Sequence, residues 1–355
     1  MEIGSILQAS SNDKYLPSGR ESVFRLPFMK DPDYFCSFYQ SGRNAIEVLF
    51  REIAEKENVL VPDFVCATVP EAIIRAGCTP VCYHIEEDLS FNPDEIAGYQ
   101  SLTKLLYVVH FFGRKMSESE IQAIRKWKEN GGIVIEDITM SLYSDASEAF
   151  GFGDYIIGSI RKWLPIADGG LIISKIRSFA PPVDSVVSLY SNYYQIAQIL
   201  KREYINSKES DKELKDTYLK FYQESIRYLF SDYSIRPISP LSMNYILNTQ
   251  DNASFSVRVE NYKYLFAKLQ NLNTVSPVVQ LEEGFVPFGM VVKCERRDEL
   301  LQNLIKNDIY CNVHWRLDFP SVSSLSKNIM TIPCDERYNR SDMDRIVEAI
   351  ENFYK

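Results

Sequence analysis

Histidine and long apolar runs are scarce in this chain, and basic residues are fewer than acidic ones. Only three of its 355 residues are histidine, which argues against a histidine-rich metal site. No apolar run reaches the roughly 18 residues that a membrane span needs, and residues 1–20 lack the basic-then-apolar order of a signal peptide. The net charge of −9 argues against nucleic acid or an anionic membrane as a partner. We therefore expect a cytoplasmic protein with no metal, no nucleic-acid partner and no membrane partner.

Cysteine is present, but not in a pattern that would carry chemistry. The seven cysteines are an odd number and show no metal-ligand spacing, so we interpret them as buried free thiols in a reducing compartment. No G-x-G-x-x-G motif follows an expected strand, which argues against a nicotinamide enzyme. The hydrophobic share of 45% and the charged share of 25% are those of an ordinary globular protein with a substantial core.

The residue pattern divides the chain into an arm and two domains. Residues 1–35 are polar and indicate an extended N-terminal arm. Residues 36–240 alternate short apolar runs with amphipathic segments, which predicts a large α/β domain with a mostly parallel sheet between helices. Residues 241–355 predict a smaller C-terminal α+β domain. The strands expected in the large domain are 59–62, 80–83, 105–109, 133–135, 155–157 and 171–173.

The smaller domain is expected to hold two helices and two strands. Helical periodicity predicts one long helix over residues 241–269 and a terminal helix over 341–354. Apolar runs predict strands over 286–292 and 310–314.

Ligands of an open parallel sheet bind outside the carboxyl ends of its strands, so residues just after the expected strands are candidates for a site. Ser41-Gly42-Arg43 stands at the start of the first long helix, where free backbone N–H groups can bind an anion. The alternative is that Ser41 is only the N-cap of that helix.

Two further candidates follow apolar strands directly. Asp137 could pair with a cationic ring nitrogen or simply cap a turn. Lys162 could be a partly desolvated, nucleophilic amine or a surface charge, and Ser159 before it could bind a phosphate. An anion cradle, a strand-end Asp and a strand-end Lys, in this chain order, fit the three contacts that pyridoxal phosphate (PLP) needs.

At these residues the sequence resembles the DegT–StrS family of sugar aminotransferases, which are fold-type I PLP enzymes similar to aspartate aminotransferase. The resemblance runs from about Ser41 to the end of the chain. The segments that carry it are Ser41–Ala45, Val61–Phe64, Ala76–Val81, Val109–Gly113, Ile135–Asp137, Lys162, Asp168–Gly170, and Ile332-Pro333 with Tyr338 and Met343.

The resemblance implies roles for these residues. Lys162 would carry the cofactor, Asp137 would pair with its ring nitrogen, and Gly42, Arg43 and Ser159 would hold its phosphate. The family works as a homodimer and moves an amino group from glutamate to a keto sugar, usually linked to a nucleotide, in polysaccharide or glycoconjugate biosynthesis. Candidates for gripping a substrate carboxylate or phosphate are Arg161, His314 and Arg316.

Two positions depart from the family pattern. Cys66 stands where the family usually has an aromatic residue that stacks on the cofactor, and Phe64 or His110 are possible substitutes. Met140 stands where the family has a hydrogen-bonding residue near the cofactor's phenolic oxygen, a role that Thr139 or Ser141 could take. Three alternatives therefore stay open: an aminotransferase, a PLP enzyme of another reaction type, and a non-catalytic relative.

Overall fold

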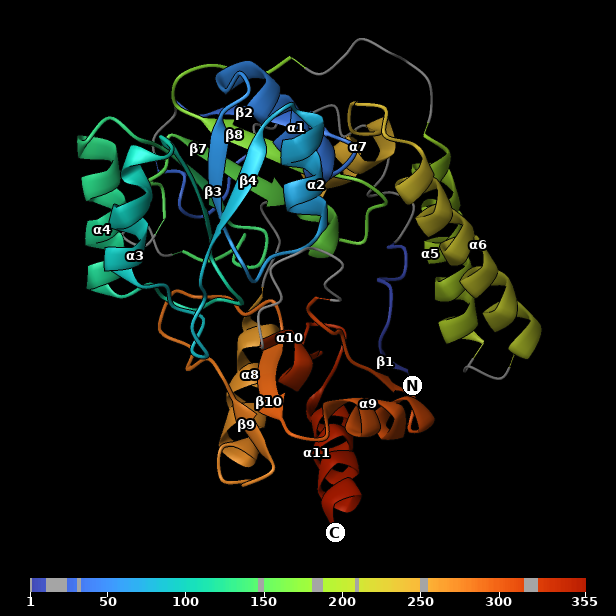
Figure 1. Cartoon of the computed structure of the whole chain (residues 1–355). Coiled ribbons are helices and arrows are strands. Elements are labelled where there is room, and N and C mark those ends of the chain that lie inside the picture. The colour runs from blue at the N-terminus through green and yellow to red at the C-terminus, as the bar shows by residue number, and fades with distance from the viewer. Residues whose placement is uncertain are drawn as a thin grey trace.

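The computed structural model describes residues 2–10, 24–30, 33–145, 150–180, 188–207, 211–249, 255–315 and 325–355. A large sheet with helices around it fills the upper part of Figure 1, and a smaller C-terminal part lies below it. A pair of long antiparallel helices, α5 (Leu189–Asn206) and α6 (Lys212–Ser231), projects along one side.

The large sheet has seven strands in the order β2-β8-β7-β6-β5-β3-β4. Strands β4, β3, β5, β6 and β7 pair in parallel, and β8 is antiparallel to both of its neighbours. The strands are β2 (Phe35–Tyr39), β3 (Asn58–Pro62), β4 (Thr79–Tyr83), β5 (Leu105–Val109), β6 (Ile133–Asp137), β7 (Tyr155–Ser159) and β8 (Gly170–Ser174). This is the mostly parallel α/β sheet that the apolar runs predicted.

Both faces of the sheet are covered, which explains why β5 and the first residues of β6 and β7 are apolar runs. Alternate residues of one strand enter different cores: Ile157 packs with α1 (Gly42–Ile53), whereas Ile156 packs with α7 (Pro240–Thr249). The first core also holds side chains of α2 (Thr68–Arg75), α3 (Pro93–Gly98) and α4 (Glu118–Glu129). The short 3-10 helices η2 (Tyr99–Ser101) and η3 (Ile160–Lys162) follow α3 and β7.

The C-terminal part builds its own core around a three-stranded antiparallel sheet, β12-β10-β9. Its helices pack against this sheet, and a short strand near the N-terminus, β1 (Ile3–Gly4), pairs in parallel with β11 (Ile309–Tyr310). The remaining elements are α8 (Ser256–Leu269), β9 (Val275–Pro277), β10 (Met290–Cys294), α9 (Arg297–Lys306), α10 (Leu325–Asn328), β12 (Ile329–Ile332) and α11 (Arg340–Tyr354).

Three sequence predictions for this part are corrected by the structure. The single helix over 241–269 is wrong, because α7 ends at Thr249 and α8 begins after Phe255. Phe255, directly before α8, has a non-helical backbone with φ −107° and ψ 15°, and residues 250–254 lie outside the described residues. The strand expected over 286–292 begins only at Met290, after a proline and a glycine, and the strand expected over 310–314 is limited to β11 and one isolated bridge at Asn312. The terminal helix is confirmed as α11.

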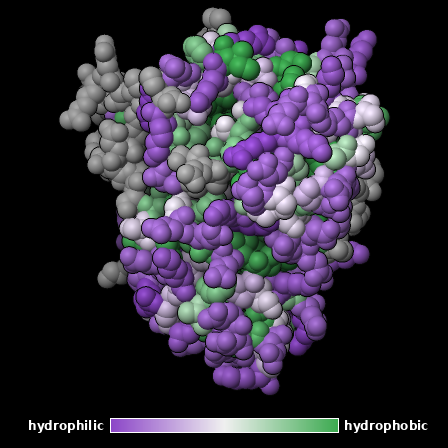
Figure 2. All heavy atoms as spheres, turned by 90° about the vertical axis from the view of Figure 1, so that its left-hand side faces the viewer, coloured by the Kyte–Doolittle hydropathy of each residue, from purple (hydrophilic) through white to green (hydrophobic). Residues whose placement is uncertain are grey.

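The face of the molecule opposite the α5–α6 pair is mainly polar. Figure 2 shows this side, where hydrophobic residues occur only in small separate groups among hydrophilic ones. Exposed apolar side chains do occur on the α5–α6 pair, at Leu189, Ile196, Ile199 and Phe230. Among the described residues, no helix is long and apolar enough to cross a membrane.

Candidate functional site

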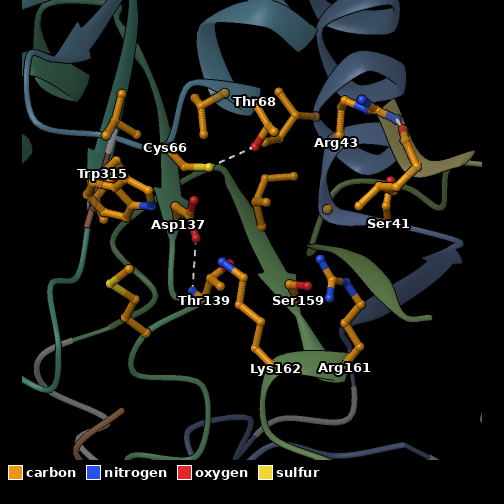
Figure 3. Close-up of a pocket in the computed structure, with 18 residues that line it drawn as sticks. Ser41, Arg43, Cys66, Thr68, Asp137, Thr139, Ser159, Arg161, Lys162 and Trp315 are labelled. Atoms are coloured by element: carbon orange, nitrogen blue, oxygen red, sulfur yellow. Dashed lines mark hydrogen bonds between the residues drawn. The ribbon is translucent and has the colours of Figure 1, made fainter. Parts of the chain in front are cut away.

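The strand ends bring the candidate residues to one edge of the large sheet. Asp137 ends β6 and Ser159 ends β7, and these strands are parallel. Gly170 begins the antiparallel β8 at the same edge, opposite both Ser159 and Tyr39. Ser41 and Gly42 follow β2 there. A cavity opens at this edge, and we call it the inner cavity; Figure 3 shows the side chains that line it.

The turn from β2 into α1 forms one wall of the inner cavity. Ser41 is the N-cap of α1 and accepts a hydrogen bond from the Asn44 N–H at 3.2 Å, as the capping alternative predicted. The cap leaves the first N–H groups of the helix, at Gly42 and Arg43, without an intrahelical acceptor. Gly170 permits this arrangement, since a Cβ there would lie 2.0 Å from the Ser41 carbonyl oxygen. The cap and an anion site can therefore coexist.

The Arg43 side chain is held by the end of α6 rather than by the cavity. Its guanidinium donates to the carbonyl oxygens of Leu229 and Asp232 and lies over the Tyr233 ring. Burial lowers the pKa of this guanidinium, while the nearby Glu71 carboxylate opposes that effect. Its Nη2 is therefore used at the end of α6, whereas its buried Nη1 has no hydrogen-bond partner among the described residues.

Asp137 is fixed by two hydrogen bonds in a buried position. Its Oδ1 accepts from the Thr139 N–H at 2.9 Å and its Oδ2 accepts from the Tyr107 hydroxyl at 2.7 Å. Tyr107 lies on β5 beside it and is fully buried. The sequence reading did not identify Tyr107, although its polar hydroxyl within an apolar strand was an available signal.

Lys162 projects into the inner cavity from η3, just after β7. Burial lowers the pKa of its ammonium group; Cys66 and Asp137 act against this shift and Arg161 acts with it. A lowered pKa increases the fraction of neutral amine, which is the nucleophilic form. The surface-charge alternative for Lys162 is therefore not what the structure shows.

The aromatic wall of the inner cavity comes from a residue that the sequence reading missed. Cys66 lines the cavity, with its Sγ 3.1 Å from the Thr68 hydroxyl. Neither proposed substitute lines it: Phe64 is fully buried behind Trp315, and His110 bonds to the Glu136 carboxylate at 3.0 Å. Trp315 itself lines the cavity beside Cys66, with its ring 4.8 Å from that of Phe64.

Met140 lines the inner cavity together with Thr139. The Ser141 hydroxyl is used elsewhere, since it donates to the His110 carbonyl oxygen and accepts from the Gly113 N–H. Of the two candidates for a compensating hydrogen bond, only Thr139 is on the cavity wall.

A second cavity, which we call the outer cavity, continues from the inner one. Cys66, Arg161, Lys162 and Trp315 line both. The far wall of the outer cavity consists of residues from the N-terminal segment, the α5–α6 pair and the C-terminal part, among them Ser5, Tyr194, Tyr222, Asn312, His314 and Arg337. The site is thus enclosed by segments that are remote in sequence.

The three substrate candidates have different outcomes. Arg161 and His314 line the outer cavity, whereas Arg316 lies outside the described residues. Burial, reinforced by the charge of Lys162, lowers the pKa of His314 to about 3. A neutral imidazole cannot form an ion pair with an anion, so His314 suits an uncharged oxygen. Its buried Nε2 has no hydrogen-bond partner among the described residues.

Asp168 has a structural role at the turn that follows Lys162. It is buried and accepts hydrogen bonds from the Ser191 hydroxyl and from the N–H and hydroxyl of Ser239. The Asp168-Gly169-Gly170 turn is thereby tied to both α5 and the segment before α7.

These groups together define the class of protein. A buried amine of lowered pKa, a strand-end carboxylate and an open helix N-terminus match the aldehyde, the ring nitrogen and the phosphate of PLP. The fold is that of the fold-type I PLP-dependent enzymes. Residues 34–175, which contain the whole seven-stranded sheet, match the model of the DegT/DnrJ/EryC1/StrS aminotransferase family. The match confirms the resemblance read from the motifs and the expected activity, a PLP-dependent aminotransferase.

Solved structures support the fold over nearly the whole chain. Helicobacter pylori PseC, an aminotransferase involved in the biosynthesis of pseudoaminic acid, matches with a TM-score of 0.69 at 13% identity, covering 99% of each chain. The sugar aminotransferase CalS13 from Micromonospora echinospora matches with a TM-score of 0.66 at 14% identity, also covering 99% of each chain. S. venezuelae DesV, solved in complex with a ketimine intermediate, matches with a TM-score of 0.62 at 17% identity, covering 95% of this chain and 91% of its own.

Proposed function

We propose that this protein moves an amino group from glutamate to a keto sugar, linked to a nucleotide, in polysaccharide or glycoconjugate biosynthesis. The observation that carries the proposal is the inner cavity, where Lys162, Asp137 and the Ser41–Gly42 turn face one another. The family match and the sugar aminotransferases among the solved structures support the choice of a sugar acceptor.

Each residue of the inner cavity would have a separate role in the reaction. Lys162 would hold the cofactor, and its amine, whose pKa burial lowers, would then carry the proton that moves at the reacting carbon. Asp137, held by Tyr107 and Thr139, would keep the ring nitrogen protonated. PLP, when bound, supplies the electron sink that makes this proton transfer possible.

The amino donor and the keto sugar would bind in the outer cavity. It opens directly onto Lys162 and offers neutral hydrogen-bonding groups, including His314, Asn312 and Tyr194. Such groups suit sugar hydroxyl and keto oxygens, which are uncharged.

We also propose that the protein acts as a homodimer in the cytoplasm. The exposed apolar side chains of α5 and α6 would be covered by a second copy, whereas the opposite face is mainly hydrophilic. All seven cysteines are free, as expected in a reducing compartment. A molar mass measured by light scattering tests the dimer, and a monomer at micromolar concentration would contradict it.

The activity is tested in two steps with the purified protein. First, borohydride reduction in the presence of PLP should fix the cofactor on the peptide that contains Lys162, and Lys162→Ala should fold but take up no label. Second, the wild-type protein should form 2-oxoglutarate from glutamate and aminate one member of a panel of nucleotide-linked keto sugars.

The outcomes separate the alternatives. Labelling of Lys162 without 2-oxoglutarate formation would favour a PLP enzyme of another reaction type. Absence of any label, despite a folded protein, would favour a non-catalytic relative in which the changes at Cys66 and Met140 have removed cofactor binding.

A further inference from the structure

We propose that Arg161 is the side chain that neutralises the phosphate of the cofactor, rather than a group that binds substrate. This inference rests on the proposed function, because it assumes that PLP occupies the inner cavity. Arg161 lies in η3 between Ser159 and Lys162 and lines the inner cavity. In Figure 3 its guanidinium extends toward the Ser159 hydroxyl, on the same side of the cavity as Ser41.

The guanidinium of Arg161 is half-buried and lies against tyrosine hydroxyl groups rather than against carboxylates. Its Nε is buried without a hydrogen-bond partner, and no carboxylate of the described residues forms an ion pair with it. Its neighbours are aromatic, with the Tyr190 ring centroid 5.8 Å away. The buried Nε has no partner, and a phosphate can accept several N–H groups of one guanidinium at once. The arrangement is therefore that of an anion site.

The other cations on the wall of the inner cavity already have different tasks. Arg43 donates to carbonyl oxygens at the end of α6 and lies 4.0 Å from the Glu71 carboxylate. Lys162 supplies the amine that holds the cofactor. A phosphate monoester carries a charge of about −2 near neutral pH. Arg161, unlike Arg43, has no carboxylate within ion-pair distance among the described residues, so its charge is the one available to balance the phosphate.

The position of Arg161 also fits the polar groups that would share the phosphate. Ser159 is two residues away, and a Cβ on Gly42 would lie 3.6 Å from the Ser159 Cβ, so the start of α1 and the end of β7 are in close contact. The free N–H groups of α1, the Ser159 hydroxyl and the Arg161 fork therefore surround one corner of the cavity. This corner is opposite the side on which Asp137 meets Trp315.

Arg161 also lines the outer cavity, so a substrate carboxylate is the competing occupant. The experiment compares PLP with pyridoxal, which has the same ring and aldehyde but no phosphate. The cofactor is removed from the wild-type protein and from Arg161→Met, Arg161→Lys and the control Arg125→Met. Arg125 lies on the surface helix α4, and its change alters the net charge by the same amount. Dissociation constants are then measured by quenching of tryptophan fluorescence.

We expect Arg161→Met to weaken PLP binding about 10- to 100-fold, because this is the usual loss of affinity when hydrogen bonds to a charged group are removed. Pyridoxal binding should be unchanged. Arg161→Lys should recover part of the difference, because it restores the charge but not the fork. Arg125→Met should bind both ligands as the wild type does. If Arg161→Met fails to fold, the ratio of PLP to pyridoxal affinity in Arg161→Lys decides in its place.

Two results would overturn the inference, and they differ in what else they overturn. Unchanged PLP affinity in Arg161→Met, with a raised KM for glutamate or the keto sugar, would assign Arg161 to the substrate and leave the proposed function intact. A folded wild-type protein that binds neither PLP nor pyridoxal would overturn the proposed function together with this inference.

Discussion

The ion pair between Asp335 and Arg337 offers a quantitative test of how the outer wall of the site is held together. The Arg337 guanidinium donates two hydrogen bonds to the Asp335 carboxylate, at 2.6 and 2.9 Å. A third, at 3.1 Å, goes to the carbonyl oxygen of Ile6 in the N-terminal segment. The pair thus joins the C-terminal part to a segment that also lines the outer cavity.

The pKa of Asp335 gives the size of the effect. Burial alone would raise this pKa, but the charge and hydrogen bonds of Arg337 outweigh burial and lower it from 3.8 to about 2. At about 1.4 kcal/mol for each pKa unit, the ionised carboxylate stabilises the folded state by about 2.5 kcal/mol at neutral pH. Its side chain is only 10% exposed, so screening by water reduces this figure little.

The direction of the pH dependence follows from the lowered pKa. The folded protein binds this proton less readily than the unfolded chain does, so the stabilisation is fully present above pH 3.8. It is lost as the pH falls through the folded-state pKa of about 2, and about half of it remains near pH 3. The free energy of unfolding should therefore decrease in acid, and this carboxylate should account for part of the decrease.

Asp335→Asn should lower the free energy of unfolding at pH 7 by at least about 2 kcal/mol, since it also leaves Arg337 buried without a charged partner. Urea unfolding followed by circular dichroism measures this at pH 7 and pH 3, and the difference from wild type should be smaller at pH 3. Asp145→Asn is the matched control, because Asp145 pairs with Lys30 in an exposed position and should contribute less than about 1 kcal/mol. Equal stabilities at pH 7, or a difference that grows in acid, would refute the reasoning.

Two further predictions concern the inner cavity. Asp137→Asn keeps the shape of the side chain but removes its charge, and should lower kcat with glutamate by about 100-fold or more, measured as 2-oxoglutarate formation; an unchanged kcat would remove Asp137 from the mechanism. Trp315→Ala should weaken PLP binding about 2- to 10-fold through loss of the aromatic wall, measured by titration of the cofactor-free protein, and Trp315→Phe should weaken it less.

The sequence was most informative where local patterns determine structure. Apolar runs such as Leu105–Val109 and Ile133–Ile135 predicted buried parallel strands correctly, because a strand covered on both faces has no polar position. The ends of these strands then placed Asp137 and Lys162 in one cavity without knowledge of the strand order.

Contacts between distant segments could not be read in the same way. Nothing local to Ile3–Gly4 predicts its pairing with Ile309–Tyr310, because two residues carry too little pattern. Nothing local to Arg43 predicts that its guanidinium donates to the carbonyl oxygens at the end of α6, a helix more than 160 residues later in the chain. His314 and Arg316 were predicted to bind substrate, but Trp315 between them was not predicted to line the site. A large aromatic residue beside polar candidates could have indicated it.

The exchange of an aromatic residue for Cys66 and the presence of Trp315 are best understood as one change. Cys66 and Trp315 line both cavities side by side, so a large ring at one position leaves little room for a ring at the other. Cys66→Tyr in the wild-type background should therefore crowd the cavity and weaken PLP binding, since added bulk in a packed site usually costs about 1–3 kcal/mol. In the Trp315→Ala background the same substitution should restore binding, because the new ring fills the space that Trp315 leaves. Additive effects of the two substitutions on the dissociation constant of PLP would mean that the two positions act independently, and that Cys66 is a loss without a compensating gain.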